Sequence, residues 1–131
     1  MYSKILVPVD LHSTETSDKA LATAKEIAKR DGASLTVVSV QIPIPADTLH
    51  AMPNLQPRLD EYLEGHQQDH PVEGLLKHSG SIAAAIQDAA EETSADLVVM
   101  GTHDPSLGDY LFGSNAASVA LHTPCSVLVV R

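Results

Sequence analysis

Two glycine positions in the last third of the chain are candidates for binding a phosphate through backbone groups. Gly101 directly follows the apolar run 97–100, and Gly113-Ser114 opens a segment with a helical pattern. A helix N-terminus offers unpaired backbone N–H groups and the positive end of the helix dipole, so it can hold a phosphate without a cation. No Lys or Arg stands between Lys77 and Arg131, which favours this backbone mechanism. The plainer interpretation is that Gly113 makes a turn and Ser114 caps a helix.

A few other side chains carry possible chemistry. Asp10, at the end of the first apolar run, can hydrogen-bond a ribose, help hold a magnesium ion, or accept backbone N–H groups of the next helix. His12 and His103 follow strand ends, and with Asp10 they would make a metal site, although nothing in the spacing requires one. Ser114 has no evident base in its neighbourhood, so we reject a nucleophilic serine. Cys125 is expected to be a small apolar filler.

Two common nucleotide-binding motifs are absent from the sequence. The turn after the first apolar run lacks the G-x-G-x-x-G of dinucleotide-binding proteins, and no G-x-x-x-x-G-K-[ST] phosphate loop occurs anywhere. A nicotinamide dehydrogenase and a P-loop NTPase are therefore improbable. No general base or arginine finger is visible either, and phosphoryl transfer usually needs such parts, so we expect at most slow phosphoryl transfer.

Five short apolar runs have the length of buried strands, and helical patterns separate them. The strands are expected at Ile5–Val9, Leu35–Val40, Val72–Lys77, Asp96–Met100 and Cys125–Val130. Apolar residues at helical spacing mark helices after Ser13, around Leu59 and after Ser81, and a fourth helix follows Gly113. The proline-rich stretch 42–57 is expected to be a loop. The alternation predicts an α/β fold with a parallel, doubly wound sheet, whose ligand would lie beyond the carboxyl ends of the strands.

Composition limits the class of protein. A chain of 131 residues fits one domain, 1–131. Its net charge of −9 repels nucleic acid and anionic membranes, and no basic cluster overcomes that repulsion. No apolar run approaches the roughly 20 residues of a membrane helix, and the first residues lack a signal-peptide pattern. With a single cysteine, these features predict a cytoplasmic protein.

Four segments together resemble the universal stress protein family. They are the opening run Ile5–Asp10, the strand end Leu97–His103, the turn Leu111–Ser114 and the closing run Pro124–Val130. The resemblance extends over essentially the whole chain in the right order, and it is weakest from Ile42 to Lys77. The closing third, with Asn115-Ala116-Ala117, looks most like the short F- and G-type members.

The resemblance implies a fold, a ligand and an assembly. The fold is a Rossmann-like adenine nucleotide alpha hydrolase-like sheet of five strands in the order 3-2-1-4-5. The assembly is a homodimer through the last strand, Cys125–Val130. The ligand is ATP, with Mg²⁺ held mainly through the phosphates. By position, the implied pocket residues are Pro8, Val9, Asp10, Val40, Met100, Gly101, His103, Asp104, Gly113, Ser114, Asn115 and Ala116.

Within this pocket, the resemblance gives each group a place. Pro8, Val9 and Asp10 would flank the adenosine, the backbone of Val40 would meet the adenine edge, and Met100 and Gly101 would line the base and ribose. Residues 113–116 would donate to the phosphates.

The sequence departs from the pattern of the ATP-binding members in two places. Those members typically have G-x2-G-x9-G-[ST], whereas Asp104 stands at the second glycine here and the interval to Gly113 is one residue shorter. The F- and G-type members share this departure, but an acidic side chain there opposes tight triphosphate binding. Three functions therefore stay open: an ATP-binding stress-response module, a dimeric interaction protein whose pocket is empty or takes only AMP or a nucleoside, and a slow ATPase.

Overall fold

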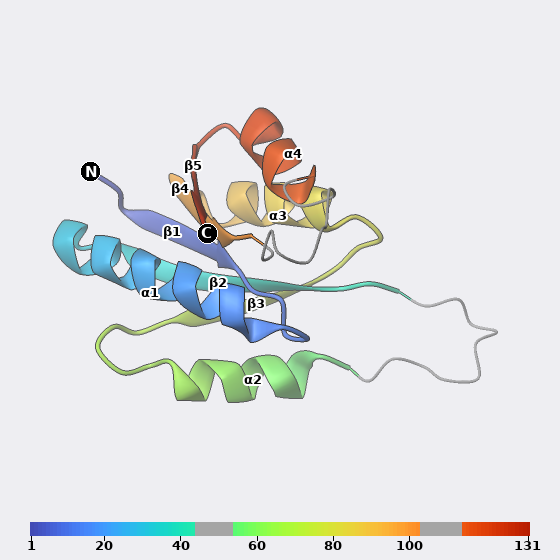
Figure 1. The fold of residues 1–131 in the computed structure, drawn as a ribbon, viewed down its shortest axis with the longest axis horizontal. Helices are drawn as coiled ribbons and strands as arrows, with labels where there is room; N and C mark the ends of the chain where they lie inside the picture. The colour runs from blue at the N-terminus through green and yellow to red at the C-terminus, as the bar shows by residue number, and fades with distance from the viewer. Residues whose placement is uncertain (44–53, 103–113) are drawn as a thin grey trace.

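The computed structural model describes residues 1–43, 54–102 and 114–131, except for the side chain of Ser114. Its centre is a sheet of five parallel strands in the order β3-β2-β1-β4-β5 (Figure 1). The strands are β1 (Lys4–Pro8), β2 (Ser34–Gln41), β3 (Glu73–His78), β4 (Leu97–Gly101) and β5 (Ser126–Val130). The predicted fold class and strand order are confirmed.

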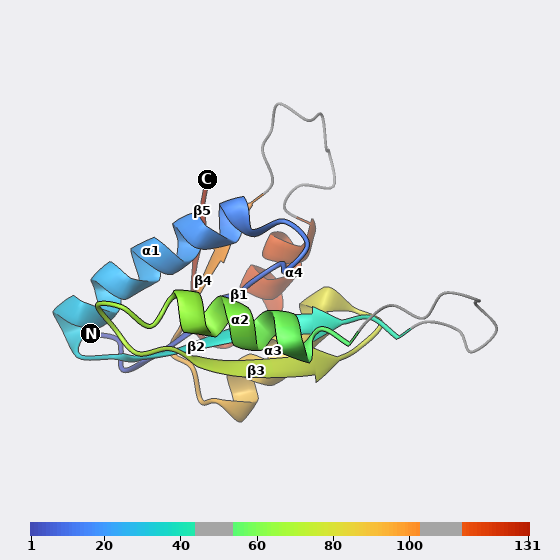
Figure 2. The same cartoon turned by 90° about the horizontal axis from the view of Figure 1, so that it is seen from below.

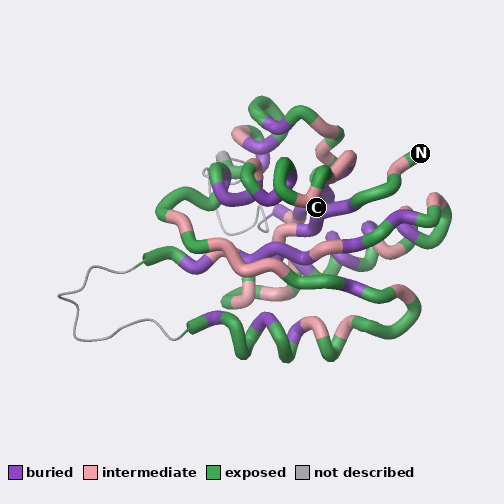
Figure 3. Tube along the Cα trace, turned by 180° about the vertical axis from the view of Figure 1, so that it is seen from behind, coloured by how far each residue is buried: buried purple, intermediate pink, exposed green. Residues whose placement is uncertain are grey.

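Four helices cover the two faces of the sheet (Figures 1 and 2). On one face lie α1 (Thr14–Asp31) and α2 (Gln56–Gly65), and on the other lie α3 (Ile82–Glu92) and α4 (Ser114–His122). Alternate residues of β1 pack into the cores on opposite faces of the sheet. Ile5 and Val7 pack with α1, and Leu6 between them packs with α3 and α4. This alternation explains why the inner strands are apolar at successive positions, and the buried residues of the sheet lie on β1, β2 and β4 (buried residues are purple in Figure 3).

Glycines fix two of the helix placements. Gly32 ends α1 in the left-handed region at φ 71°, as the Asp31-Gly32 pair predicts. Gly74 stands in β3 beneath α2, where a Cβ would lie 2.4 Å from Leu63 Cδ1. The absence of a side chain at Gly74 therefore leaves room for Leu63 of α2 against β3. No helix in the described ranges is long and apolar enough to cross a bilayer.

Two local details differ from what the residue types predict. Ser13 has a residue type that can cap a helix and occupies the N-cap position of α1, but its side chain makes no capping hydrogen bond. Asp96 lies just before β4 instead of inside it, and its carboxylate accepts from the backbone N–H groups of Ser3 (2.8 Å) and Lys4 (3.0 Å). Asp96 therefore holds the start of β1 beside the start of β4.

Candidate functional site

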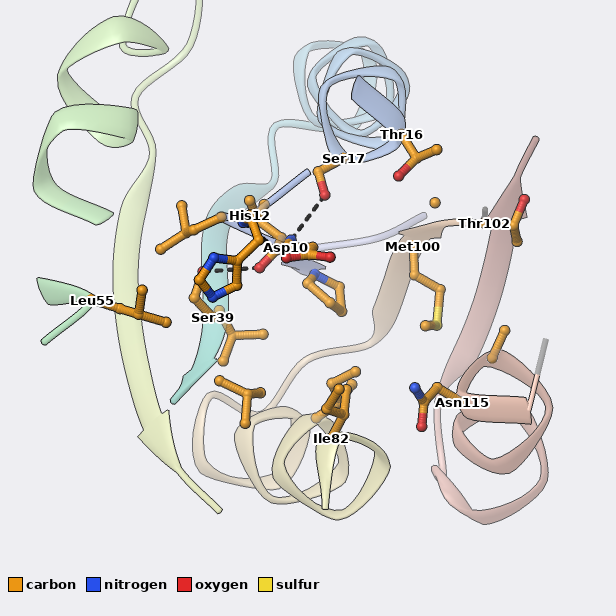
Figure 4. A pocket seen from close by; sticks show the side chains of 18 of the residues that line it. Asp10, His12, Thr16, Ser17, Ser39, Leu55, Ile82, Met100, Thr102 and Asn115 are labelled. Atoms are coloured by element: carbon orange, nitrogen blue, oxygen red, sulfur yellow. Dashed lines mark hydrogen bonds between the residues drawn. The ribbon is translucent and has the colours of Figure 1, made fainter. Parts of the chain in front are cut away.

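A pocket of about 470 Å³ opens at the carboxyl ends of β1, β2 and β4 (Figure 4). This is where the strand order reverses around β1, as expected for a ligand site in an open parallel sheet. The first turns of α1, α3 and α4 and the start of α2 complete its wall. Its lining consists of Pro8, Val9, Asp10, Leu11, His12, Thr16, Ser17, Val38, Ser39, Val40, Ile42, Leu55, Ile82, Ile86, Met100, Gly101, Thr102, Asn115 and Ala116.

The turn between β1 and α1 presents the only carboxylate among the described lining residues. Asp10 N donates to the hydroxyl of buried Ser17 at 3.0 Å, and His12 N donates to Asp10 Oδ1 at 2.9 Å. The second bond is the backbone-accepting role predicted for Asp10. It holds the exposed carboxylate at the pocket, where its charge faces whatever enters.

The end of β2 supplies an apolar flank. Val40 and Ile42 lie here, with Leu55 from the start of α2 and Ile82 from the first turn of α3. Leu55 reaches the pocket because its N–H donates to Gln41 Oε1 at 2.8 Å, in a buried bond across 14 residues of chain. Apolar side chains on this flank form a slot suited to a flat ring system.

On the opposite flank the pocket is bounded by β4 and the first turn of α4. Thr102 N donates to Val130 O at 3.1 Å, which ties the end of β4 to β5. Asn115 and Ala116 follow Ser114, the first residue of α4, and both line the pocket. The unpaired N–H groups of a helix start therefore belong to this wall, as an anion site without cations requires.

The structure brings eight of the twelve predicted residues to one pocket. These are Pro8, Val9, Asp10, Val40, Met100, Gly101, Asn115 and Ala116. His103, Asp104 and Gly113 lie outside the described residues, and Ser114 begins α4 with its side chain also outside them. The proposed histidine–histidine–aspartate metal site includes His103, so its geometry is outside the description too.

Sequence reasoning missed one contact at the pocket mouth. Arg58 Nη1 lies 3.3 Å from Nδ1 of His12, although the two residues are 46 positions apart. His12 lines the pocket, and Arg58, on the first turn of α2, is not itself a lining residue. No short-range pattern marks this pair, because it depends on where α2 docks. Ser17, Ile82 and Ile86 were missed for a related reason, since each follows a strand end by a helical turn or more.

The family comparison covers the complete chain. The model for the universal stress protein family matches residues 1–131. Universal stress protein G of Shigella flexneri is 33% identical over 147 residues, with 100% of both chains covered. The chain belongs to the universal stress protein family.

Solved structures agree with this assignment at the level of the fold. A universal stress protein from Archaeoglobus fulgidus matches with a TM-score of 0.78 and 24% identity, over 100% of both chains. A structure from the same organism, in complex with dAMP, matches with a TM-score of 0.74 and 23% identity, over 99% of this chain and 98% of that one. At these identities the likeness concerns the sheet and its helices.

Proposed function

We propose that this universal stress protein binds an adenine nucleotide in the pocket at the ends of β1, β2 and β4. The observation that carries the proposal is the arrangement of the pocket, which has an apolar slot on the β2 flank and a helix start on the β4 flank. Asp10 stands at the end of the central strand between them. A planar base would lie in the apolar slot, a sugar beside Asp10 and a phosphate at the helix start.

Relatives with the same fold support this choice of ligand. One universal stress protein was solved with dAMP, another with cAMP, and a family member from Arabidopsis thaliana with AMP bound. In this chain the base would lie against Val40, and Asp10 would meet the ribose. The volume of about 470 Å³ is within the roughly 300–1,000 Å³ of small-molecule sites.

ATP with Mg²⁺ held through its phosphates is our leading ligand, and AMP or adenosine alone is the alternative. The described lining favours the alternative in one respect, because it contains Asp10 but no Lys or Arg. Each further phosphate would then depend on backbone N–H groups of residues 113–116, with Asp104 nearby in sequence. We further propose a cytoplasmic regulatory module that acts by binding, with slow ATP hydrolysis as the weaker alternative.

We also propose that β5 joins two copies of the chain into a homodimer. Strand β5 ends the sheet order, so its outer edge has no neighbouring strand among the described elements. Leu128 and Val129 on it are 38% and 39% exposed. An apolar strand edge of this kind favours pairing with a second copy.

Mass spectrometry of the small molecules that co-purify with the protein tests the ligand directly. We expect an adenine nucleotide, and its phosphate count separates ATP from AMP. A thermal shift series with ATP–Mg²⁺, AMP, adenosine and GTP extends the test, because a ligand that binds only the folded state raises the melting temperature. Replacing Gly113 with Val and Ser114 with Ala should abolish the ATP-dependent part of the shift. No shift with any adenine compound at millimolar concentration would overturn the proposal.

A further inference from the structure

We infer that His12 and Arg58 form a second phosphate contact, which selects nucleotides phosphorylated on the ribose 2′ or 3′ oxygen in addition to the 5′ position. This inference rests on the proposed adenine-nucleotide pocket and names the class of nucleotide that the pocket prefers. The two residues lie on different elements, and their ring nitrogen and guanidinium nitrogen are 3.3 Å apart.

The chemistry of the contact fixes the state of the imidazole. A guanidinium group can only donate hydrogen bonds, so Nδ1 of His12 must accept. A protonated imidazole would place a second donor and a second positive charge against Arg58. With Nδ1 accepting, the outward ring nitrogen Nε2 is left to donate. The pair then consists of donors only, with one full positive charge.

Arg58 has no carboxylate within 4 Å among the described residues, and it contacts the His12 ring beside the pocket instead. Lys29, Arg30 and Lys77 do have such a partner, at Asp69, Asp31 and Glu92 respectively. Within the described ranges Lys4, Lys19 and Lys25 also lack one, but the guanidinium of Arg58 contacts a residue that lines the pocket. A guanidinium in that place is suited to bind an anionic group of a ligand.

The position of Arg58 is set by two bonds that hold α2. Leu55 N donates to Gln41 Oε1 at 2.8 Å, just before the helix begins. Tyr62, one turn beyond Arg58, donates its hydroxyl hydrogen to Asp18 Oδ1 of α1 at 2.8 Å. Residues four apart share a helix face, so Arg58 stands on the same side of α2 as Tyr62, toward α1 and the β1–α1 turn.

The pair is separate from the helix start at the other flank. Figure 4 shows His12 on the side of Leu55 and Ser39, with Asn115 across the pocket. β2 and β4 flank β1, so the two sides of the pocket are about 10 Å apart at the usual strand spacing. One phosphate cannot reach both ends, but a nucleotide with a 5′-phosphate at α4 can direct a ribose phosphate toward His12.

Asp10 and His12 lie in the same turn, which places the proposed ribose contact beside the imidazole. The carboxylate of Asp10, which we propose meets the ribose, accepts from the N–H of His12 at 2.9 Å. A carboxylate suits a ribose hydroxyl, whereas an arginine accommodates a ribose phosphate. The β1–α1 turn presents the carboxylate, Asp10, and α2 presents the arginine, Arg58.

Calorimetric titration with matched nucleotides tests the inference. The ligands are AMP, ADP, adenosine 3′,5′-bisphosphate and adenosine 2′,5′-bisphosphate. ADP is the control for phosphate number, since it carries two phosphates in one chain. We expect at least one bisphosphate isomer to bind about tenfold more tightly than ADP.

Three variants separate charge from structure. Arg58→Gln should remove most of that preference while changing AMP affinity far less, and Arg58→Lys should keep part of it. Lys19→Gln, an equal charge change at an exposed α1 residue, should keep all of it. Equal affinities for ADP and both bisphosphates in the unmodified protein would overturn the inference. So would equal losses for AMP and bisphosphate in Arg58→Gln with a lower melting temperature, because that result marks a purely structural tie.

Failure of the proposed function gives a different result. In that case neither adenosine, AMP nor any bisphosphate binds the unmodified protein, whereas failure of this inference alone leaves AMP binding intact.

Discussion

Gly101, the last residue of β4, lies against the first turn of α1. A Cβ at this position would lie 2.4 Å from the backbone oxygen of Thr16 and 2.8 Å from its carbonyl carbon. Backbone atoms of a helix cannot move aside as a flexible side chain can. We expect Gly101→Ala to lower the free energy of unfolding by about 1–3 kcal/mol, measured by chemical denaturation, because it overpacks this contact.

Gly65→Ala is the matched control for that change. Gly65 is the last residue of α2, and a Cβ there meets no atom within 4 Å. Because alanine has the higher helix propensity, this variant should be neutral or slightly stabilising. Equal destabilisation by the two substitutions would show that Gly101 is not held against α1.

Gly101 also shows what residue types can and cannot predict. The sequence singles it out as a point of close backbone approach to a ligand, and the residue does line the pocket. The position that a side chain would take at Gly101, however, is occupied by Thr16 of α1. No short-range sequence pattern reveals this contact. Asp10 could be placed at the site because the end of the first strand is visible in the sequence, and Met100 because of the family resemblance. Arg58 and Leu55 could not, since they reach the site through the docking of α2.

At the scale of elements, the end of α1 is tied to the start of β1. The carboxylate of Asp31 accepts from Tyr2 N at 3.0 Å and from Arg30 Nε at 2.8 Å. The Arg30 guanidinium, followed by the Tyr2 N–H, lowers the pKa of Asp31 from 3.8 to about 2. The ionised carboxylate therefore stabilises the folded state, in which alone these partners are held beside it.

This tie predicts a stability difference that depends on pH. A lowered folded-state pKa contributes stability that is complete above the unfolded pKa and is lost as pH falls through the folded pKa. The gap in unfolding free energy between the unmodified protein and Asp31→Asn should be constant from neutral pH to about pH 5 and shrink between about pH 4 and 2. Urea denaturation at a series of pH values measures it.

Arg30→Gln should narrow the pH range over which this stability gap shrinks, because it removes the largest cause of the lowered pKa of Asp31. A gap between the unmodified protein and Asp31→Asn that stayed unchanged down to pH 2 would contradict the tie.

The elements were largely predictable, and their ends were predictable to within about one residue for the strands. Each strand was expected from a short apolar run, and each begins and ends within one residue of its predicted bounds. The errors at the ends have physical causes. Asp96 has a strand-like neighbourhood, but its carboxylate is used by Ser3 and Lys4 across the sheet. Ser13 has the right residue type for a cap, yet its side chain makes no capping bond.

At the scale of the whole molecule, the edge at β5 predicts an assembly. A lysine at position 129 would place a charge in the proposed interface between two copies, where it would be desolvated without a partner. We expect Val129→Lys to give a monomer and the unmodified protein a dimer, by light scattering at micromolar concentration.

Ala84→Lys is the control for the dimer experiment, because Ala84 is exposed on α3, which does not form the β5 edge. That variant should remain dimeric. A monomeric unmodified protein would contradict the assembly outright.

The strand order places the pocket where the whole sheet divides. From β1 the chain adds β2 and β3 on one side and β4 and β5 on the other, so the helix starts of α1, α3 and α4 meet above the central strand. The order 3-2-1-4-5 was expected from the family resemblance, since composition and periodicity predict a doubly wound sheet but not its order. The proposed function requires that an adenine nucleotide bind in this pocket.

Titration of AMP into the unmodified protein, Ile82→Trp and Leu121→Trp is the most direct test of that claim. Ile82 lines the pocket and is 38% exposed, so a tryptophan there fills the base slot. Leu121 is 79% exposed on α4 and does not line the pocket, which makes it the control. We predict AMP binding to the unmodified protein and to Leu121→Trp, with binding lost in Ile82→Trp. AMP binding to Ile82→Trp with undiminished affinity, or to none of the three proteins, would contradict the account.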